Sequence, residues 1–200
     1  MTSRWLIVVL LFTWVTGSAV TLRAQVAPER SSAGRVREPR LKLRTDAFRD
    51  AGRLPLQYTC WAEDDQIVSP ALQWSFTPTG TQSFTLMVTA PQNLRRSFSQ
   101  DFLWVRWNIP GSITEIPEGV PQGAELPDGS RQVKSEEIVG YNPPCAPGGV
   151  GELHYEFMLL ALDTMLTLPS SATGEDVSEA IDGHILGASV YYGTMERMPE

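Results

Sequence analysis

The segment from Gly140 to Asp163 constrains the fold more than any other, because it joins a stiff loop directly to a strand with one fully apolar face. Prolines in its first half each fix φ at about −65°, and the glycines that follow restore conformational freedom. From Leu153 to Leu162, alternate residues on one face are all hydrophobic, whereas the other face begins with His154 and Glu156 and ends apolar. This pattern predicts a strand that starts at a solvent-accessible rim and enters the middle of a packed sheet.

Short apolar or alternating runs recur along the chain and are separated by clusters of Pro, Gly, Asp and Ser. Such spacing is typical of an antiparallel β-sandwich. Hydrophobic residues make up 42% of the 200 residues, which is enough for one core. The predicted strands are Leu54–Thr59, Leu72–Phe76, Ser83–Thr89, Phe102–Asn108 and Leu153–Leu162.

One helix is predicted after the last of these strands. Thr173 can act as its N-cap, and Asp176 is placed three residues later to complete a capping box. Hydrophobic residues then follow at helical spacing, which indicates that the helix packs on the sheet. These residues are Val177, Ala180, Ile181, Ile185 and Ala188.

Residues 1–24 have the order of features found in a secretory signal peptide. Arg4 provides a positive start, and Trp5–Val15 is an apolar run too short to span a bilayer. Either Gly17-Ser18-Ala19 or Leu22-Arg23-Ala24 offers a cleavage site, after Ala19 or after Ala24. No cysteine follows this run, so lipoprotein processing is not expected. Residues 25–40 are rich in arginine, and we expect a solvated linker there rather than a tether for an anionic surface. The folded domain is expected to span residues 41–198.

Removing Arg4 and Arg23 with the signal peptide changes the formal charge from −7 to −9. A strongly acidic domain is a poor binder of nucleic acid. Because no apolar segment long enough to span a membrane remains after this removal, we expect a periplasmic or secreted protein.

The two cysteines, Cys60 and Cys145, raise the question of a disulfide. An oxidising compartment permits the bond, and two free thiols would be unusual there. The alternative is that both are small buried residues. A zinc site built from both cysteines with His154 and His184 is a third option, but the spacing matches no structural zinc pattern, and we expect neither a metal nor a cofactor.

The chain has two histidines, which limits any acid–base mechanism. His184 falls in the predicted helix, where packing explains it better than catalysis does. His154 starts a strand beside the proline-rich loop and is the better candidate for contact with a ligand. No G-x-S-x-G, Gly-Lys-Ser, Gly-Lys-Thr or H-E-x-x-H motif occurs, so the common hydrolase and nucleotide-binding signatures are absent.

The Gly140–Asp163 segment resembles the second signature of the phosphatidylethanolamine-binding protein family, in its bacterial, Raf-kinase-inhibitor-like branch. That signature runs G-Y-x-G-P-C-P-P, a short glycine-containing gap, then H-x-Y-x-F-x-x-Y-A-L-D. Further blocks in the family's order extend the resemblance over residues 54–197, and it implies a Greek-key β-sandwich with a C-terminal helix. The matching blocks are Tyr58–Cys60, Ser69–Ser75, Gly80–Phe84, Trp104-Val105, Asn108–Pro110, Ile116–Gly119, Gly140-Tyr141, Pro144-Cys145, Pro147, Tyr155, Phe157 and Ala161–Asp163.

The family's anion pocket, as the resemblance implies it, is lined by an acidic D-P-D turn, the histidine of an H-W-V motif and the histidine of H-x-Y. All three polar positions differ in this chain, where the motifs read Ala90-Pro91-Gln92, Leu103-Trp104-Val105 and Leu153-His154-Tyr155. His154 comes one residue after the expected position. In a strand it therefore points to the opposite face, unless the start of the strand is bulged.

Changing all three positions together avoids leaving one polar group buried without a partner. We therefore expect the pocket to be apolar, smaller or closed, with altered positions at Ala90, Gln92, Leu103 and Leu153. Five residues keep the motifs and either shape a cleft or pack in the core. These residues are Pro91, Trp104, Tyr141, Pro144 and Tyr155.

These features favour a non-catalytic binding or regulatory module. Its expected partner is a small apolar ligand or lipid, or an exported protein such as a protease, because the resembled family includes protease inhibitors. A hydrolytic enzyme and a domain with a vestigial pocket are the alternatives. The enzyme has little support, since the altered pocket lacks acids and bases.

Overall fold

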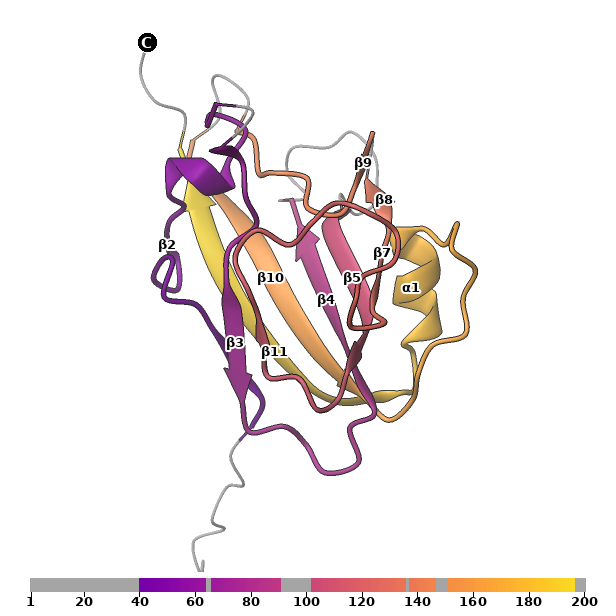
Figure 1. Ribbon diagram of the computed structural model, residues 1–200. Coiled ribbons are helices and arrows are strands. Elements are labelled where there is room, and N and C mark those ends of the chain that lie inside the picture. The colour runs from indigo at the N-terminus through magenta and orange to yellow at the C-terminus, as the bar shows by residue number, and fades with distance from the viewer. Residues whose placement is uncertain (1–39, 64–65, 91–101, 136, 147–150, 197–200) are drawn as a thin grey trace, which may run out of the picture. The chain divides into compact units, whose positions relative to one another are not determined.

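The protein is described by a computed structural model that covers residues 40–63, 66–90, 102–135, 137–146 and 151–196 (Figure 1). Within these ranges the fold is mainly β, as the sequence predicts, with a six-stranded sheet, a three-stranded sheet and a two-stranded hairpin. The large sheet has the order β2 (Gly52–Arg53), β11 (Ile185–Met195), β10 (Leu153–Leu162), β4 (Ser83–Thr89), β5 (Phe102–Pro110), β7 (Arg131–Gln132). The small sheet has the order β1 (Lys42–Arg44), β3 (Leu72–Ser75), β6 (Glu115–Ile116), and the hairpin pairs β8 (Lys134–Ser135) with β9 (Ile138–Val139).

Strand β10 is the centre of the large sheet and separates two hydrophobic clusters. It pairs antiparallel with β11 on one side and with β4 on the other. Tyr155, Phe157 and Leu159 face the small sheet, where they pack with residues of β1 and β3. Leu160 and Leu162 belong to the second cluster on the opposite face. The alternation seen in the sequence thus gives a sheet that is covered on both faces along its middle.

Helix α1 (Gly174–Ala180) covers the second face. The predicted capping box is present, since the Thr173 hydroxyl accepts from the Asp176 N–H at 3.1 Å and the Asp176 carboxylate accepts from the Thr173 N–H at 2.8 Å. Val177 and Ile181 are buried in the second cluster with residues of β4 and β5. The prediction of a capped helix packed on the sheet is therefore confirmed.

The helix ends before the last residues of the hydrophobic face that the sequence predicts for it. Gly183 adopts φ +78, a left-handed conformation that glycine allows, and the chain then enters β11. Ile185 and Ala188 belong to this strand, so their assignment to the helical face was wrong, and His184 lies in the turn between α1 and β11.

One further prediction about strands was wrong. Leu54–Thr59 contains no strand but a single 3₁₀ turn, η1 (Leu56–Tyr58), which follows Pro55 and is closed by the Thr59 N–H donating to the Leu56 carbonyl. Strand β2 precedes this turn and pairs with β11 in parallel, so the large sheet is not antiparallel throughout.

A disulfide joins Cys60 to Cys145, with Cα atoms 5.3 Å apart and a sequence separation of 85. It connects the segment after η1 to the proline-rich loop. The Cys60 N–H also donates to the Pro144 carbonyl at 3.0 Å, so the two segments are hydrogen-bonded as well as covalently linked. The predicted pairing is confirmed, and it leaves no thiolate for the zinc site considered above.

Candidate functional site

The residues at the altered motif positions come together at one end of the large sheet. Ala90 follows β4, Leu103 lies in β5 and Leu153 begins β10. Leu153 is buried, Ala90 and Leu103 are partly buried, and all three belong to the hydrophobic cluster that faces the small sheet. Pro91 and Gln92, the remaining residues of that turn, lie outside the described residues.

The aromatic candidates of the same cluster have their polar atoms occupied by the fold. The Trp104 indole N–H donates to Gln132 Oε1 at 2.7 Å. The Tyr141 hydroxyl donates to the Tyr58 carbonyl at 2.6 Å, and the Tyr155 hydroxyl donates to the Cys145 carbonyl at 2.9 Å. These groups hold loops in place, because each bonds to a residue of a different segment. Pro144 is likewise buried, and its carbonyl accepts from Cys60.

Burial also fixes the protonation of the two tyrosines. Desolvation raises the pKa of Tyr155 to about 12, although the hydrogen bond to the Cys145 carbonyl opposes this rise. Burial raises the pKa of Tyr141 well above its usual value, with a smaller contribution from Tyr58. Both phenols are therefore neutral donors near pH 7, and neither supplies a general base.

His154 lies on the other face of β10. It is exposed, whereas its neighbours Leu153 and Tyr155 are buried, and the register with β11 runs without a bulge from Leu153 through Tyr155. Its Nε2 lies 3.3 Å from a carboxylate oxygen of Glu152. His154 thus points away from the cluster that contains the altered positions.

His184 lies at the opposite end of the β10–β11 pair from His154. Its Nδ1 lies 2.8 Å from the carboxylate of Asp163, which follows the last residue of β10, and both side chains are exposed. The two histidines therefore share no site. Among the described residues, no three His, Cys, Asp or Glu side chains are grouped closely enough to hold a metal ion.

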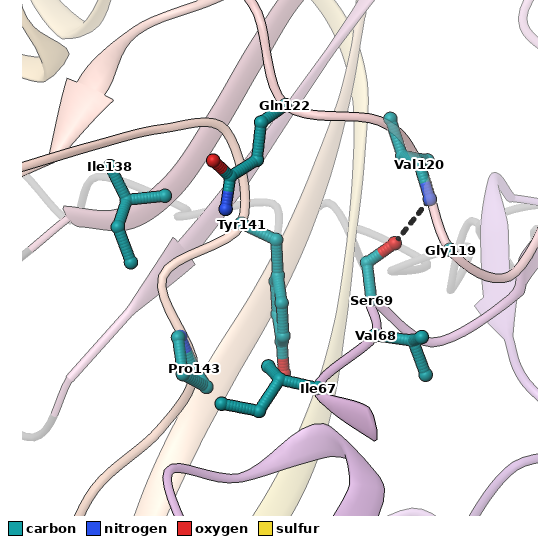
Figure 2. A pocket seen from close by; sticks show the side chains of 9 residues that line it. All are labelled: Ile67, Val68, Ser69, Gly119, Val120, Gln122, Ile138, Tyr141 and Pro143. Carbon is teal, nitrogen blue, oxygen red and sulfur yellow. Dashed lines mark hydrogen bonds between the residues drawn. The ribbon is translucent and has the colours of Figure 1, made fainter. Parts of the chain in front are cut away.

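A pocket of about 320 Å³ is lined in part by Tyr141 (Figure 2). Three segments that are distant in the sequence form it: 67–69 after η1, 119–122 after β6, and 138–143 from β9 into the proline-rich loop. Sequence reasoning identified Tyr141 but missed the pocket, since no local pattern links the other segments. Its lining residues are Ile67, Val68, Ser69, Gly119, Val120, Gln122, Ile138, Tyr141 and Pro143.

Backbone and side-chain hydrogen bonds fasten the pocket's walls to each other. The Gly119 N–H donates to the Ser69 carbonyl and the Val120 N–H donates to Ser69 Oγ, both at 2.9 Å. Gln132 Nε2 donates to the carbonyls of Pro121 and Gly123 at 3.0 Å, while its oxygen accepts from Trp104.

Tyr141 is fixed from two directions. Its ring packs edge-to-face on Trp104 with centroids 5.4 Å apart, and its hydroxyl is bonded to Tyr58. Its orientation in the pocket wall is therefore set by the protein itself. Figure 2 shows the Gln122 side chain directed from the upper wall toward Tyr141.

A sequence profile of the phosphatidylethanolamine-binding proteins matches residues 44–196. The chain belongs to the phosphatidylethanolamine-binding protein family. Among relatives in this family, a UPF0098 protein from Methanothermobacter thermautotrophicus is 40% identical over 158 residues, covering 78% of this chain and 99% of that protein. LppC, a candidate lipoprotein from Mycobacterium tuberculosis, is 32% identical over 162 residues, covering 78% of this chain and 72% of that protein.

Solved structures agree with the assignment to the phosphatidylethanolamine-binding protein family. The crystal structure of a candidate family homologue from Chlamydia trachomatis matches with a TM-score of 0.67 and 28% identity, covering 80% of this chain and 99% of that one. YbcL from Escherichia coli matches with a TM-score of 0.71, covering 80% of this chain and 100% of that one, and at 23% identity it supports the fold alone.

The disulfide also bears on the location of the protein. The Cys60–Cys145 disulfide is of a kind typical of oxidising, extracytoplasmic compartments. In the described part of the chain, no helix has the length and apolar character needed to cross a bilayer.

Proposed function

We propose that this protein is an exported, non-catalytic binding module whose phosphate-type anion site has been replaced by apolar contacts. The observation that carries the proposal is the placement of Ala90, Leu103 and Leu153 together in one hydrophobic cluster. In the resembled family these positions correspond to an acid and two histidines.

Energetics support the loss of anion binding. A charge-assisted hydrogen bond contributes about 1.5 to 3 kcal/mol, so losing two histidine contacts weakens binding by roughly a hundredfold or more. The nearby Trp104, Tyr141 and Tyr155 cannot replace these contacts, because their donors already serve carbonyl or amide groups of the protein. A catalytic role is disfavoured on the same grounds, since both tyrosines remain protonated near neutral pH.

Export is supported by the disulfide, by the similarity to a candidate lipoprotein and by the signal-like residues 1–24. The proposed location is the periplasm or the exterior of the cell. Sequencing the N-terminus of the protein recovered there checks this part of the proposal, because Met1 or Thr2 at that position would show that no signal peptide is removed.

Calorimetric titration with phosphate and with phosphoethanolamine near pH 7 tests the binding part. We expect no saturable heat at ligand concentrations up to about 1 mM. The variant His154→Ala is compared with His184→Ala, a matched control in which the other exposed, carboxylate-paired histidine is removed at the far end of β10.

Saturable binding by the wild-type protein contradicts the proposal whatever the variants do. If His154→Ala abolishes such binding and His184→Ala does not, an anion site has formed around His154. If neither substitution changes it, the anion binds elsewhere on the domain.

A further inference from the structure

We propose that the pocket between residues 67–69, 119–122 and 138–143 binds a small uncharged ligand that has an apolar body and one hydrogen-bonding group. This site lies beside Tyr141 and contains none of the three altered motif positions. The inference rests on the proposed function only in treating the protein as a binding module, and it adds where the ligand sits and what its chemistry is.

The walls of the pocket specify the apolar body. Ile67, Val68, Val120, Ile138 and Pro143 supply aliphatic surface, and Tyr141 supplies an aromatic ring whose hydroxyl is already bonded. A volume of about 320 Å³ lies at the lower end of the range of roughly 300 to 1,000 Å³ that small-molecule sites occupy. The ligand is therefore small, about the size of two or three fused or linked rings.

The absence of charge in the lining specifies that the ligand is neutral. Among the residues described as lining the pocket, none carries an ionised side chain at neutral pH. Burying a charged group without an opposite charge is costly. Glu118 precedes the lining residue Gly119 and accepts hydrogen bonds from Tyr58 and Gln57, so a carboxylate beside this wall also disfavours anions.

Gln122 specifies the polar group of the ligand. Three backbone donors of the walls are used within the protein, since the N–H groups of Val68, Gly119 and Val120 donate to the Gln57 carbonyl, the Ser69 carbonyl and Ser69 Oγ. Gln122 is exposed and directed toward Tyr141 (Figure 2). Its amide can accept one hydrogen bond and donate another, which suits an alcohol, an amine or an amide.

The pocket exists before any ligand binds. The disulfide and the Cys60–Pro144 hydrogen bond join the segment after η1 to the loop that carries Tyr141 and Pro143. Gln132 holds the 121–123 segment through two carbonyls. A preformed site avoids the cost of ordering loops on binding, so binding in the micromolar range is attainable with few contacts.

A matched pair of fluorescent probes tests the inference. N-phenyl-1-naphthylamine is neutral and has one N–H donor, and 8-anilinonaphthalene-1-sulfonate has the same rings with an added sulfonate. Both are titrated into the disulfide-bonded protein and followed by probe fluorescence. We expect the neutral probe to bind saturably at one site and the sulfonate to bind at least tenfold more weakly.

Two substitutions locate the binding. Val120→Phe fills the pocket and is expected to weaken binding of the neutral probe at least tenfold, whereas Val190→Phe, at a similarly half-buried valine on β11, leaves it unchanged. Gln122→Ala alters an exposed residue that carries little risk to folding, and it is expected to weaken binding about three- to tenfold through loss of one hydrogen bond.

The inference is overturned if the sulfonate binds as tightly as the neutral probe, or if Val120→Phe and Gln122→Ala both bind the neutral probe like the wild type. It is also overturned if the neutral probe shows no saturable binding. Because phosphate binding is measured by heat without either probe, failure of this site and failure of the proposed loss of the anion site give separate results.

Discussion

Removing the Cys60–Cys145 disulfide is expected to destabilise the domain strongly while leaving its folded structure in place. The double substitution Cys60→Ala with Cys145→Ala removes the covalent link. The Cys60 N–H to Pro144 bond and the Tyr141 hydroxyl to Tyr58 bond join the same two segments and use no cysteine sulfur, so the folded geometry has other supports. The loss is therefore expected mainly from the greater freedom of the unfolded chain.

The magnitude follows from the length of the loop that the disulfide closes. For the 85-residue separation, the chain-entropy relation gives a stabilisation of about 4.6 kcal/mol at 25 °C. A domain of about 150 residues loses roughly 2 to 4 °C in Tm per kcal/mol, so the expected fall is about 9 to 18 °C.

Thermal unfolding followed by circular dichroism measures this shift, with urea unfolding for the free energy. Wild-type protein treated with reductant is expected to approach the double variant, and the double variant itself is expected to be insensitive to reductant. A loss in the free energy of unfolding below about 1 kcal/mol, with an unchanged native spectrum, would refute the loop-closure reasoning.

Two further predictions concern single side chains. Burial opposes ionisation of Asp128, but hydrogen bonds from Ser130 and the charge of Arg106 outweigh burial and lower the pKa of Asp128. The ionised carboxylate therefore stabilises the folded protein above the unfolded pKa of about 4, and this stabilisation is lost as the pH falls through the lower folded pKa. Asp128→Asn is thus expected to flatten the acid side of the stability–pH profile measured by urea unfolding, and an unchanged acid slope would contradict this. Thr173→Ala removes the capping box with Asp176 and is expected to lower the free energy of unfolding, measured in urea, by about 1 kcal/mol. Thr173→Ser keeps a hydroxyl at the cap and is expected to retain most of that free energy.

The parts of the fold that the sequence predicts are those in which a local pattern has one structural meaning. Ser83–Thr89 and Leu153–Leu162 have the predicted limits, because continuous or alternating hydrophobic residues bounded by turns fit a strand and little else. The capping box is equally local, since it depends on two side chains three residues apart.

Strand β11 could not be recognised in the same way. Ile185 and Ala188 continue the helical spacing of Val177 and Ile181, so a helix and a strand fit the same residues. The decisive signal was Gly183, which ends the helix by turning the chain, and the tyrosines and valine that follow favour a strand. Tertiary pairing with β10 settles the competition.

The candidate sites were only partly predictable for a related reason. Exposure of His154 follows from the period of two in a strand that starts beside buried Leu153. The pocket beside Tyr141 depends on loops 67–69 and 119–122, which meet only after the sheets have packed. Backbone hydrogen bonds such as Gly119 to Ser69 bring these loops together, and no sequence pattern encodes them.

The position of β11 in the sheet has a consequence for the order of folding during synthesis. Every residue of β10 from Leu153 to Leu162 is paired with β11, which the ribosome makes after all the other described strands. Until β11 is made, one whole edge of the central strand has no partner, and the nascent chain presents an open edge that can pair with other chains. The large sheet therefore cannot be completed until the last described strand has been made, and a chain that is still incompletely paired would suit the export proposed above.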